Sequence, residues 1–251
     1  MSKIISVHSF RGGTGKSNTV ANIAAASALN GMRVGVVDTD INSPGIHVLF
    51  GMDQSESTYT LNDYLWGKCS IKDTAHDVTA TLKGNLPGKI YLIPSSMNAG
   101  EITRVIREGY DVGLLNDGFQ DLIDDLDLDL LLIDTHPGLN EETVLSIAIS
   151  DVLLLIMRPD QQDFMGTSVT VEVARKLGVP SMYLLVNKIP ESLDKEDLKK
   201  QAEQLYNCAV AAMVPHSEKM MVLGSKSIFS LEFPDDPLTE IYAGLAALVS
   251  E

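Results

Sequence analysis

Residues 6–20 read SVHSFRGGTGKSNTV, and this stretch decides the fold. The apolar segment Ile4–His8 leads into it as a predicted strand, and a helical pattern over Lys16–Asn30 follows, with Gly31 as its C-cap. The loop between them is rich in glycine, which lets backbone N–H groups converge on one point. A strand, a glycine-rich loop and a helix N-terminus in this order predict a phosphate-binding loop.

The residue types in the loop suit a nucleoside triphosphate with its metal ion. Lys16 can reach the β- and γ-phosphates, and the Ser17 hydroxyl can hold Mg²⁺. We therefore expect the nucleotide to be bound by a continuous run, namely Gly12, Gly13, Thr14, Gly15, Lys16, Ser17 and Asn18. The usual GxxxxGK[ST] pattern, however, has a glycine where this chain has Phe10, and a second cation, Arg11, follows.

Composition sets the class of protein. The chain has 251 residues, 45% of them hydrophobic, without a Pro/Ser/Gly-rich linker or an internal repeat, so we predict that the phosphate-binding loop belongs to a single domain over residues 1–251. The formal net charge of −15 disfavours general nucleic-acid binding and anionic membrane surfaces, which both require clustered Lys and Arg.

Cysteines and apolar runs indicate the compartment. Cys69 and Cys208 are far apart and match neither a disulfide framework nor a metal site. The first ten residues lack the apolar segment of a signal peptide, and apolar runs are too short to span a membrane. We therefore expect a cytoplasmic protein without an evident membrane anchor.

Short apolar runs alternate with helical patterns along the chain. The predicted strands are Ile4–His8, Arg33–Val37, Ile90–Ile93, Leu130–Ile133, Val152–Met157, Met182–Val186 and Ala209–Val214. The predicted helices are Lys16–Asn30, Glu101–Glu108, Asp117–Asp124, Glu141–Ile149, Thr167–Leu177, Asp194–Tyr206 and Leu238–Val249. This alternation predicts a doubly wound α/β fold with a mostly parallel sheet of seven to eight strands and helices on both faces.

Acidic residues follow two of these strands, at the edge where such folds bind ligands. Asp38 and Asp40 come after the second strand, and Asp134 ends the apolar run Leu130–Ile133. Asp134 in this position has the form of a Walker B aspartate that binds Mg²⁺ through its waters. Two carboxylates near a γ-phosphate would repel it unless a metal ion and Lys16 compensate. Capping of turns is the alternative interpretation of Asp38 and Asp40.

The segment YLLVNKIPESL indicates the base. Guanine recognition in NKxD loops needs an aspartate where this chain has Pro190, whereas the Asn187 amide can donate to N7 and accept from N6 of adenine. The sequence therefore favours ATP over GTP.

Taken together, these motifs resemble the MinD/ParA group of P-loop ATPases. The loop matches the variant KGGxGK[ST], with Arg11 in place of the first lysine, and Thr135-His136-Pro137-Gly138 resembles the turn D-[ST]-P-x-G. In that family the extra lysine reaches across a dimer to the partner's nucleotide. Arg11 keeps the charge and adds a fork suited to phosphate, although an ordinary loop arginine is the alternative.

The resemblance implies roles for further residues. Asp38 would lie near Mg²⁺ and Asp40 would position the attacking water, so the expected catalytic set is Lys16, Asp38, Asp40 and Arg11. Mg²⁺ would be held by Ser17, Asp38 and Asp134. The Gly138 N–H would sense the γ-phosphate. Asn187 would contact adenine, and Pro215 and His216 would close over it through the main chain. His136 has two interpretations, a turn residue or a catalytic base, and we favour the turn residue.

The family pattern further implies an ATP-bound homodimer that opens on slow hydrolysis, stimulated by an activating or cargo protein. Such a switch would serve intracellular positioning or regulation. An ATP-dependent ligase of the dethiobiotin synthetase type and a module that holds nucleotide without hydrolysing it are the alternatives. Segments 97–119 and 158–177 are candidate dimer or partner contacts. Seven aspartates over residues 117–134 form either a solvated face or a docking surface for a basic partner.

Overall fold

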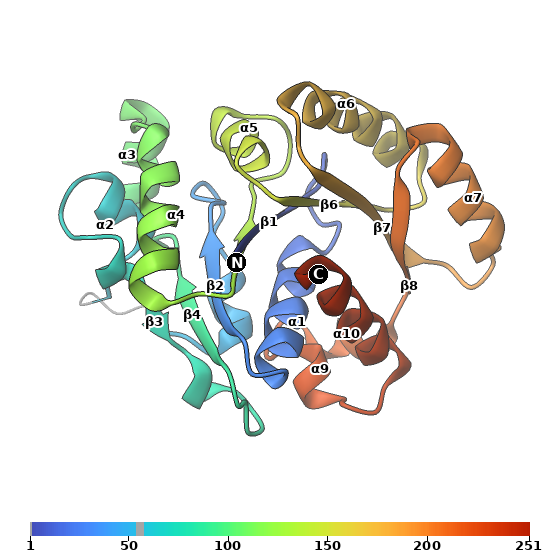
Figure 1. Cartoon of the computed structure of the whole chain (residues 1–251), viewed down its shortest axis with the longest axis horizontal. Helices are drawn as coiled ribbons and strands as arrows, with labels where there is room; N and C mark the ends of the chain where they lie inside the picture. The colour runs from blue at the N-terminus through green and yellow to red at the C-terminus, as the bar shows by residue number, and fades with distance from the viewer. Residues whose placement is uncertain (1, 54–57) are drawn as a thin grey trace.

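An eight-stranded sheet forms the centre of the computed structural model, which describes residues 2–53 and 58–251 (Figure 1). The strand order is β3-β4-β2-β5-β1-β6-β7-β8. The strands are β1 (Lys3–His8), β2 (Arg33–Asp38), β3 (His76–Asp77), β4 (Lys89–Ile93), β5 (Leu130–Asp134), β6 (Val152–Met157), β7 (Ser181–Ile189) and β8 (Ala209–Pro215). All neighbours pair in parallel except β3, which runs antiparallel to β4.

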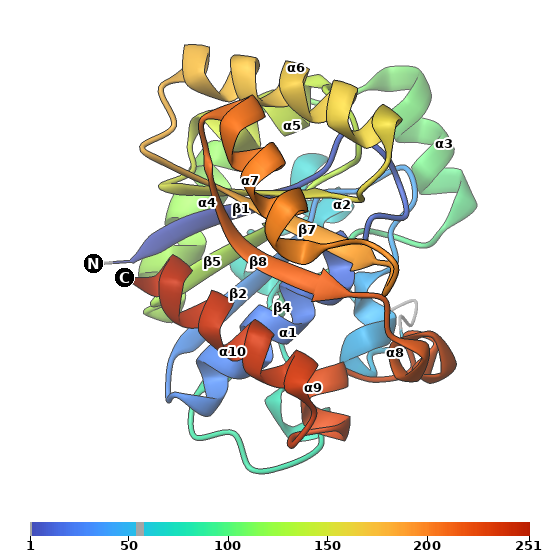
Figure 2. The ribbon, with the colours of Figure 1, turned by 90° about the vertical axis from the view of Figure 1, so that its right-hand side faces the viewer.

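Helices cover both faces of this sheet, as Figures 1 and 2 show. The α-helices are α1 (Lys16–Leu29), α2 (Leu61–Leu65), α3 (Ala99–Glu108), α4 (Gly113–Leu126), α5 (Glu141–Ala148), α6 (Gln161–Leu177), α7 (Lys195–Tyr206), α8 (Glu218–Leu223), α9 (Phe229–Glu232) and α10 (Pro237–Ser250). Helices α1, α9 and α10 pack on one face, and α4 to α7 on the other. The predicted fold class is confirmed.

The central strands are buried on both sides, which explains their continuous apolar runs. Every residue of β5 and β6 is buried. Side chains of β1 pack alternately into the layer under α1, where Ile5 lies, and into the opposite layer, where Ile4 lies. Within the described residues, no helix combines the length and the apolar character that crossing a membrane requires.

The structure corrects some predicted boundaries. Helix α6 begins at Gln161 and not at Thr167, because the Asp160 carboxylate accepts hydrogen bonds from the backbone N–H groups of Gln162 and Asp163. Helix α4 begins four residues before the predicted Asp117. The two-residue strand β3 and the short helices α2, α8 and α9 were not predicted, because such elements are shorter than the period that a pattern needs. Helix α1 ends at Leu29 with Asn30 as its C-cap, so Gly31, predicted as the C-cap, lies one residue beyond it with a left-handed φ of +86°.

Candidate nucleotide-binding site

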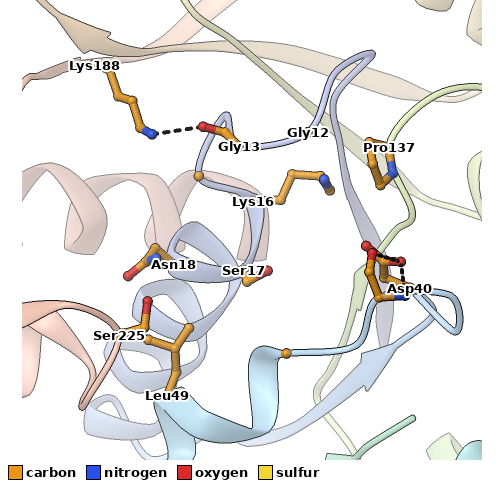
Figure 3. A pocket seen from close by; sticks show the side chains of 13 residues that line it. Gly12, Gly13, Lys16, Ser17, Asn18, Asp40, Leu49, Pro137, Lys188 and Ser225 are labelled. Atoms are coloured by element: carbon orange, nitrogen blue, oxygen red, sulfur yellow. Dashed lines mark hydrogen bonds between the residues drawn. The ribbon is translucent and has the colours of Figure 1, made fainter. Parts of the chain in front are cut away.

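The loop between β1 and α1 borders an open cavity at the carboxyl edge of the sheet (Figure 3). The cavity has a volume of about 400 Å³. Its lining residues are Gly12, Gly13, Gly15, Lys16, Ser17, Asn18, Asp40, Ser43, Gly45, Leu49, Pro137, Lys188 and Ser225. The predicted phosphate-binding run therefore lines the cavity, except for Thr14, whose side chain is buried elsewhere.

Two glycines of the loop have conformations that suit only glycine. Gly13 has φ of +73° and Gly15 has φ of +104°. A Cβ on Gly15 would also collide with the side-chain amide of Asn187. Gly15 is the N-cap of α1 and provides no side-chain acceptor, so the first N–H groups of the helix are free to meet an anion.

Lys16 lies at the start of α1 and is only 8% exposed. Its Nζ lies 3.4 Å from the Ser9 hydroxyl, and the side chain extends toward Pro137 in Figure 3. A cation so deeply placed and so weakly bonded is poised to meet a charged ligand in the cavity.

Two carboxylates stand side by side because of the sheet register. Asp38 ends β2 and pairs with Asp134 at the end of β5, and both are almost fully buried. Burial first, and then the Asp134 charge, raise the pKa of Asp38 well above its ordinary value. Burial raises the pKa of Asp134 to about 6, although Lys16 and the Ser17 hydroxyl oppose the shift.

These carboxylates fit a divalent cation. The Oδ1 atom of Asp134 is buried and has no hydrogen-bond partner among the described residues. Mg²⁺ prefers oxygen ligands of this kind, and its charge would offset the repulsion between Asp38 and Asp134. Asp38 also shapes the backbone, because its two oxygens accept from the N–H groups of Asp40 (3.0 Å) and Gly45 (3.2 Å). The capping role considered for Asp38 is therefore present in the structure.

Asp40 lies at the rim of the cavity and contacts a residue that sequence reasoning did not connect with it. Its Oδ1 accepts from the backbone N–H (3.1 Å) and the hydroxyl (2.8 Å) of Ser43. The Nε2 atom of His136 lies 3.7 Å from the same oxygen. The Nδ1 atom of His136 donates to the Pro137 carbonyl at 2.6 Å. His136 therefore faces the predicted water-positioning carboxylate across the loop.

A second cavity of about 390 Å³ lies where the base is predicted, and Asn187, Pro215 and His216 all line it. The Asn187 Nδ2 donates to the Thr14 carbonyl at 2.8 Å, and its Oδ1 accepts from the Lys188 N–H at 2.8 Å. One N–H and one lone pair remain for a base. The His216 N–H donates to the Ile189 carbonyl at 2.9 Å, and Pro215 has no N–H. The main chain of these two residues therefore has only its carbonyl oxygens available to a base.

Comparison with known proteins decides the family. A family model described as an AAA domain matches residues 2–179. An uncharacterized ATP-binding protein of Methanocaldococcus jannaschii is 27% identical over 251 residues, covering 98% of this chain and 88% of that protein. The chain belongs to the MinD/ParA family of P-loop ATPases.

Solved structures of this family share the fold. The septum site-determining protein MinD of Pyrococcus horikoshii, complexed with Mg-ADP, superposes with a TM-score of 0.80 at 21% identity, covering 99% of this chain and 96% of that one. The MinC:MinD cell division protein complex of Aquifex aeolicus gives 0.80 at 16% identity, covering 100% and 96%. At these identities the likeness shows the MinD-like fold.

Arg11, which the sequence resemblance matched to the family's variant lysine, is bonded within its own chain. Its Nη1 lies 3.2 Å from Oδ1 of Asp160 and 3.2 Å from Oδ1 of Asp163. Asp160 and Asp163 belong to the N-terminal turn of α6, part of the segment that the sequence marked for dimer or partner contacts. The guanidinium of Arg11 is therefore paired with carboxylates of α6 in its own chain.

Phe10, which replaces the usual glycine, packs against the same helix. Its ring occupies the space that a Cβ on Gly166 would need. Phe10 and Arg11 together dock the tip of the loop on the first turns of α6. Gly138 is also engaged, because its N–H donates to the Ser9 carbonyl at 3.2 Å. A role of that N–H in sensing a γ-phosphate would require it to exchange partners.

Proposed function

We propose that this chain is a Mg-ATP-dependent switch that dimerises in its ATP state and hydrolyses ATP slowly under the control of a protein partner. The observation that carries the proposal is the juxtaposition of the phosphate-binding loop, the buried Lys16 and the carboxylates of Asp38 and Asp134 around one cavity. Relatives that are ATP-binding, and a MinD solved with Mg-ADP, support the nucleotide and the metal ion.

The residues have separate tasks in this proposal. The N–H groups of residues 12–18 and the Lys16 ammonium bind the phosphates and stabilise the negative charge that develops between the β- and γ-phosphates. Ser17, Asp38 and Asp134 would hold Mg²⁺, which supplies charge neutralisation on the phosphates. Asp40 lies at the cavity rim, where its carboxylate accepts a hydrogen bond from the attacking water and orients it. The side-chain amide of Asn187 would hydrogen-bond the adenine base.

Dimerisation would bring Arg11 of one subunit to the nucleotide of the other, as the resemblance to the family's variant loop implies. The MinC:MinD complex of a structural neighbour supports a protein partner. The net charge of −15 favours such a partner over nucleic acid. Regulation or spatial organisation in the cytoplasm is the cellular role that this behaviour fits.

The deciding experiment measures molar mass by light scattering with Mg-ADP and with Mg-ATP, for wild type, Arg11→Ala and Asp40→Ala. We expect a dimer only with ATP, a persistent dimer in Asp40→Ala because hydrolysis is slow, and no dimer in Arg11→Ala. A protein that stays monomeric with ATP in all three forms contradicts the switch. Phosphate release is measured alongside, and Lys16→Ala should abolish nucleotide binding.

A further inference from the structure

The cavity beside the phosphate-binding loop (the phosphate-side cavity) and the cavity beside Asn187 (the base-side cavity) are two halves of one groove. They share four lining residues: Gly15, Asn18, Lys188 and Ser225. These residues therefore mark the waist of the groove. In a nucleotide bound across both halves, the group between the base and the phosphates is the ribose. The waist is thus the place where its 2′- and 3′-hydroxyl groups need hydrogen-bond partners.

Only two of the shared residues have polar side-chain groups available. Gly15 has no side chain, and the Lys188 Nζ donates to the Gly13 carbonyl at 2.8 Å, as Figure 3 shows. Across residues 2–53 and 58–251, the side chains of Asn18 and Ser225 have no hydrogen-bond partner within the protein. An amide and a hydroxyl each can donate and accept, which is what a ribose hydroxyl requires.

Backbone geometry singles out the same place. The described residues include four non-glycine positions with positive φ: Asp127, Lys188, Asn207 and Ser225. Asp127 and Asn207 are the C-caps of α4 and α7, a usual place for this conformation. Lys188 (φ +57°) and Ser225 (φ +61°) both lie at the waist. Non-glycine residues held in this region occur preferentially where a ligand is bound.

The three chain segments that meet here are far apart in sequence. Asn18 belongs to the first turn of α1, Lys188 to the end of β7, and Ser225 to the turn that follows α8. Gly224, the C-cap of α8 with φ of +59°, reverses the chain so that Ser225 lines both halves of the groove. Leu49 provides an apolar wall on the phosphate side, near Asn18 and Ser225 in Figure 3.

We propose that Asn18 and Ser225 form a ribose-binding subsite, in which their side chains hydrogen-bond the 2′- and 3′-hydroxyl groups of the bound nucleotide. The subsite rests on the proposed binding of ATP and adds to it a selectivity for ribonucleotides over deoxyribonucleotides. Asn18 thereby acts through its side chain in addition to its place in the phosphate-binding loop.

The test is calorimetric titration with Mg-ATP and Mg-2′,3′-dideoxy-ATP. Ser225→Ala, Asn18→Ala and the double variant are compared with wild type. Ser227→Ala is the matched control, since Ser227 lies two positions away and lines neither cavity. One net hydrogen bond corresponds to roughly threefold in affinity. We expect wild type and Ser227→Ala to prefer ATP by about tenfold, each single variant by about threefold, and the double variant not at all.

The affinity for the dideoxynucleotide should stay the same in wild type and Ser225→Ala, because this ligand cannot use the subsite. Titration with 2′-deoxy-ATP and 3′-deoxy-ATP then assigns each side chain to one hydroxyl. A wild-type protein that binds ATP and dideoxy-ATP equally overturns the subsite and leaves ATP binding intact. The subsite is also overturned if Ser225→Ala weakens both ligands by the same factor. Failure of wild type to bind either ligand overturns the proposed function as well.

Discussion

The Arg11 guanidinium lies 3.2 Å from the buried Asp163 carboxylate of its own chain, so the tip of the phosphate-binding loop is tied to helix α6. Asp163 has a second cationic partner, since it also accepts from the backbone N–H (2.9 Å) and the Nε (3.1 Å) of Arg158. Departure of Arg11 would therefore not leave Asp163 as an unpaired buried charge. In this respect Arg11 can exchange partners at low cost.

The first prediction concerns the ion pair between Arg11 and Asp160, the N-cap of α6. Asp160→Asn removes one carboxylate charge near Arg11 but keeps a good N-cap for α6. In the Asp40→Ala background with Mg-ATP, we expect the dimer dissociation constant to fall by about twofold to fivefold. The reason is that Arg11 no longer has to break one exposed ion pair within its own chain before it contacts the partner subunit. Sedimentation velocity over a concentration series measures it. Asp194→Asn, the equivalent N-cap of α7, is the control and should have no effect.

The second prediction concerns the contact of Phe10 with Gly166. Gly166→Ala places a methyl group in the space of the Phe10 ring, and overpacking of this kind costs about 1–3 kcal/mol. We expect a lower free energy of unfolding in urea and weaker nucleotide binding. Phe10→Gly in the same chain should restore most of both. Gly244→Ala in α10 is the control, because a Cβ there meets open space. Equal stability of Gly166→Ala and wild type would contradict the contact.

The third prediction concerns the paired carboxylates. Because the pKa of Asp134 is raised in the folded protein to about 6, the charged form costs stability, and the loss develops as pH rises from about 4 through 6. At pH 7 in EDTA, Asp134→Asn should therefore be more stable than wild type by about 2–3 kcal/mol. Urea unfolding measures the difference. Mg-ATP should stabilise wild type only. The prediction is refuted if Asp134→Asn without nucleotide is less stable than wild type.

The fourth prediction concerns His8, which is buried at the end of β1. Thr135 Oγ1 donates to the Val7 carbonyl, so the His8 Nδ1 donates to Thr135 at 2.7 Å, and Nε2 lacks a partner within the described residues. Burial, then Lys16, then His136 lower the pKa of His8 to about 3. A lowered histidine pKa stabilises the fold above about pH 6.5, and this stability is lost as pH falls toward 3.

Between pH 7 and pH 4 the loss from His8 should be about 3 kcal/mol. His8→Asn keeps a donor for Thr135 and does not titrate, so its unfolding free energy should depend less on pH by that amount. Urea denaturation at several pH values tests this. An identical pH dependence in both proteins would show that His8 is not buried in its neutral form.

Much of the site was predictable because it is local in sequence. The strand, loop and helix around Gly12–Ser17 were located from their residue types, and Asp38, Asp134 and Asn187 were placed at strand ends, where parallel pairing collects them at one edge. The start of α6 was missed although Asp160 carries an N-cap signal, because the pattern after it, with Gly166, does not favour a helix. The proximity of His136 to Asp40 had no signal in either segment.

The sequence by itself determined the class of fold and the presence of a phosphate-binding loop, since both depend on periodicity and on glycine conformations that neighbouring residues decide. Only the tertiary structure decided what Arg11 and Phe10 contact, because Asp160, Asp163 and Gly166 lie about 150 residues further along and reach the loop through the packing of α6. The same holds for Asn18 and Ser225. Contacts between distant segments depend on how the sheet brings its loops together, and short patterns carry no information about that.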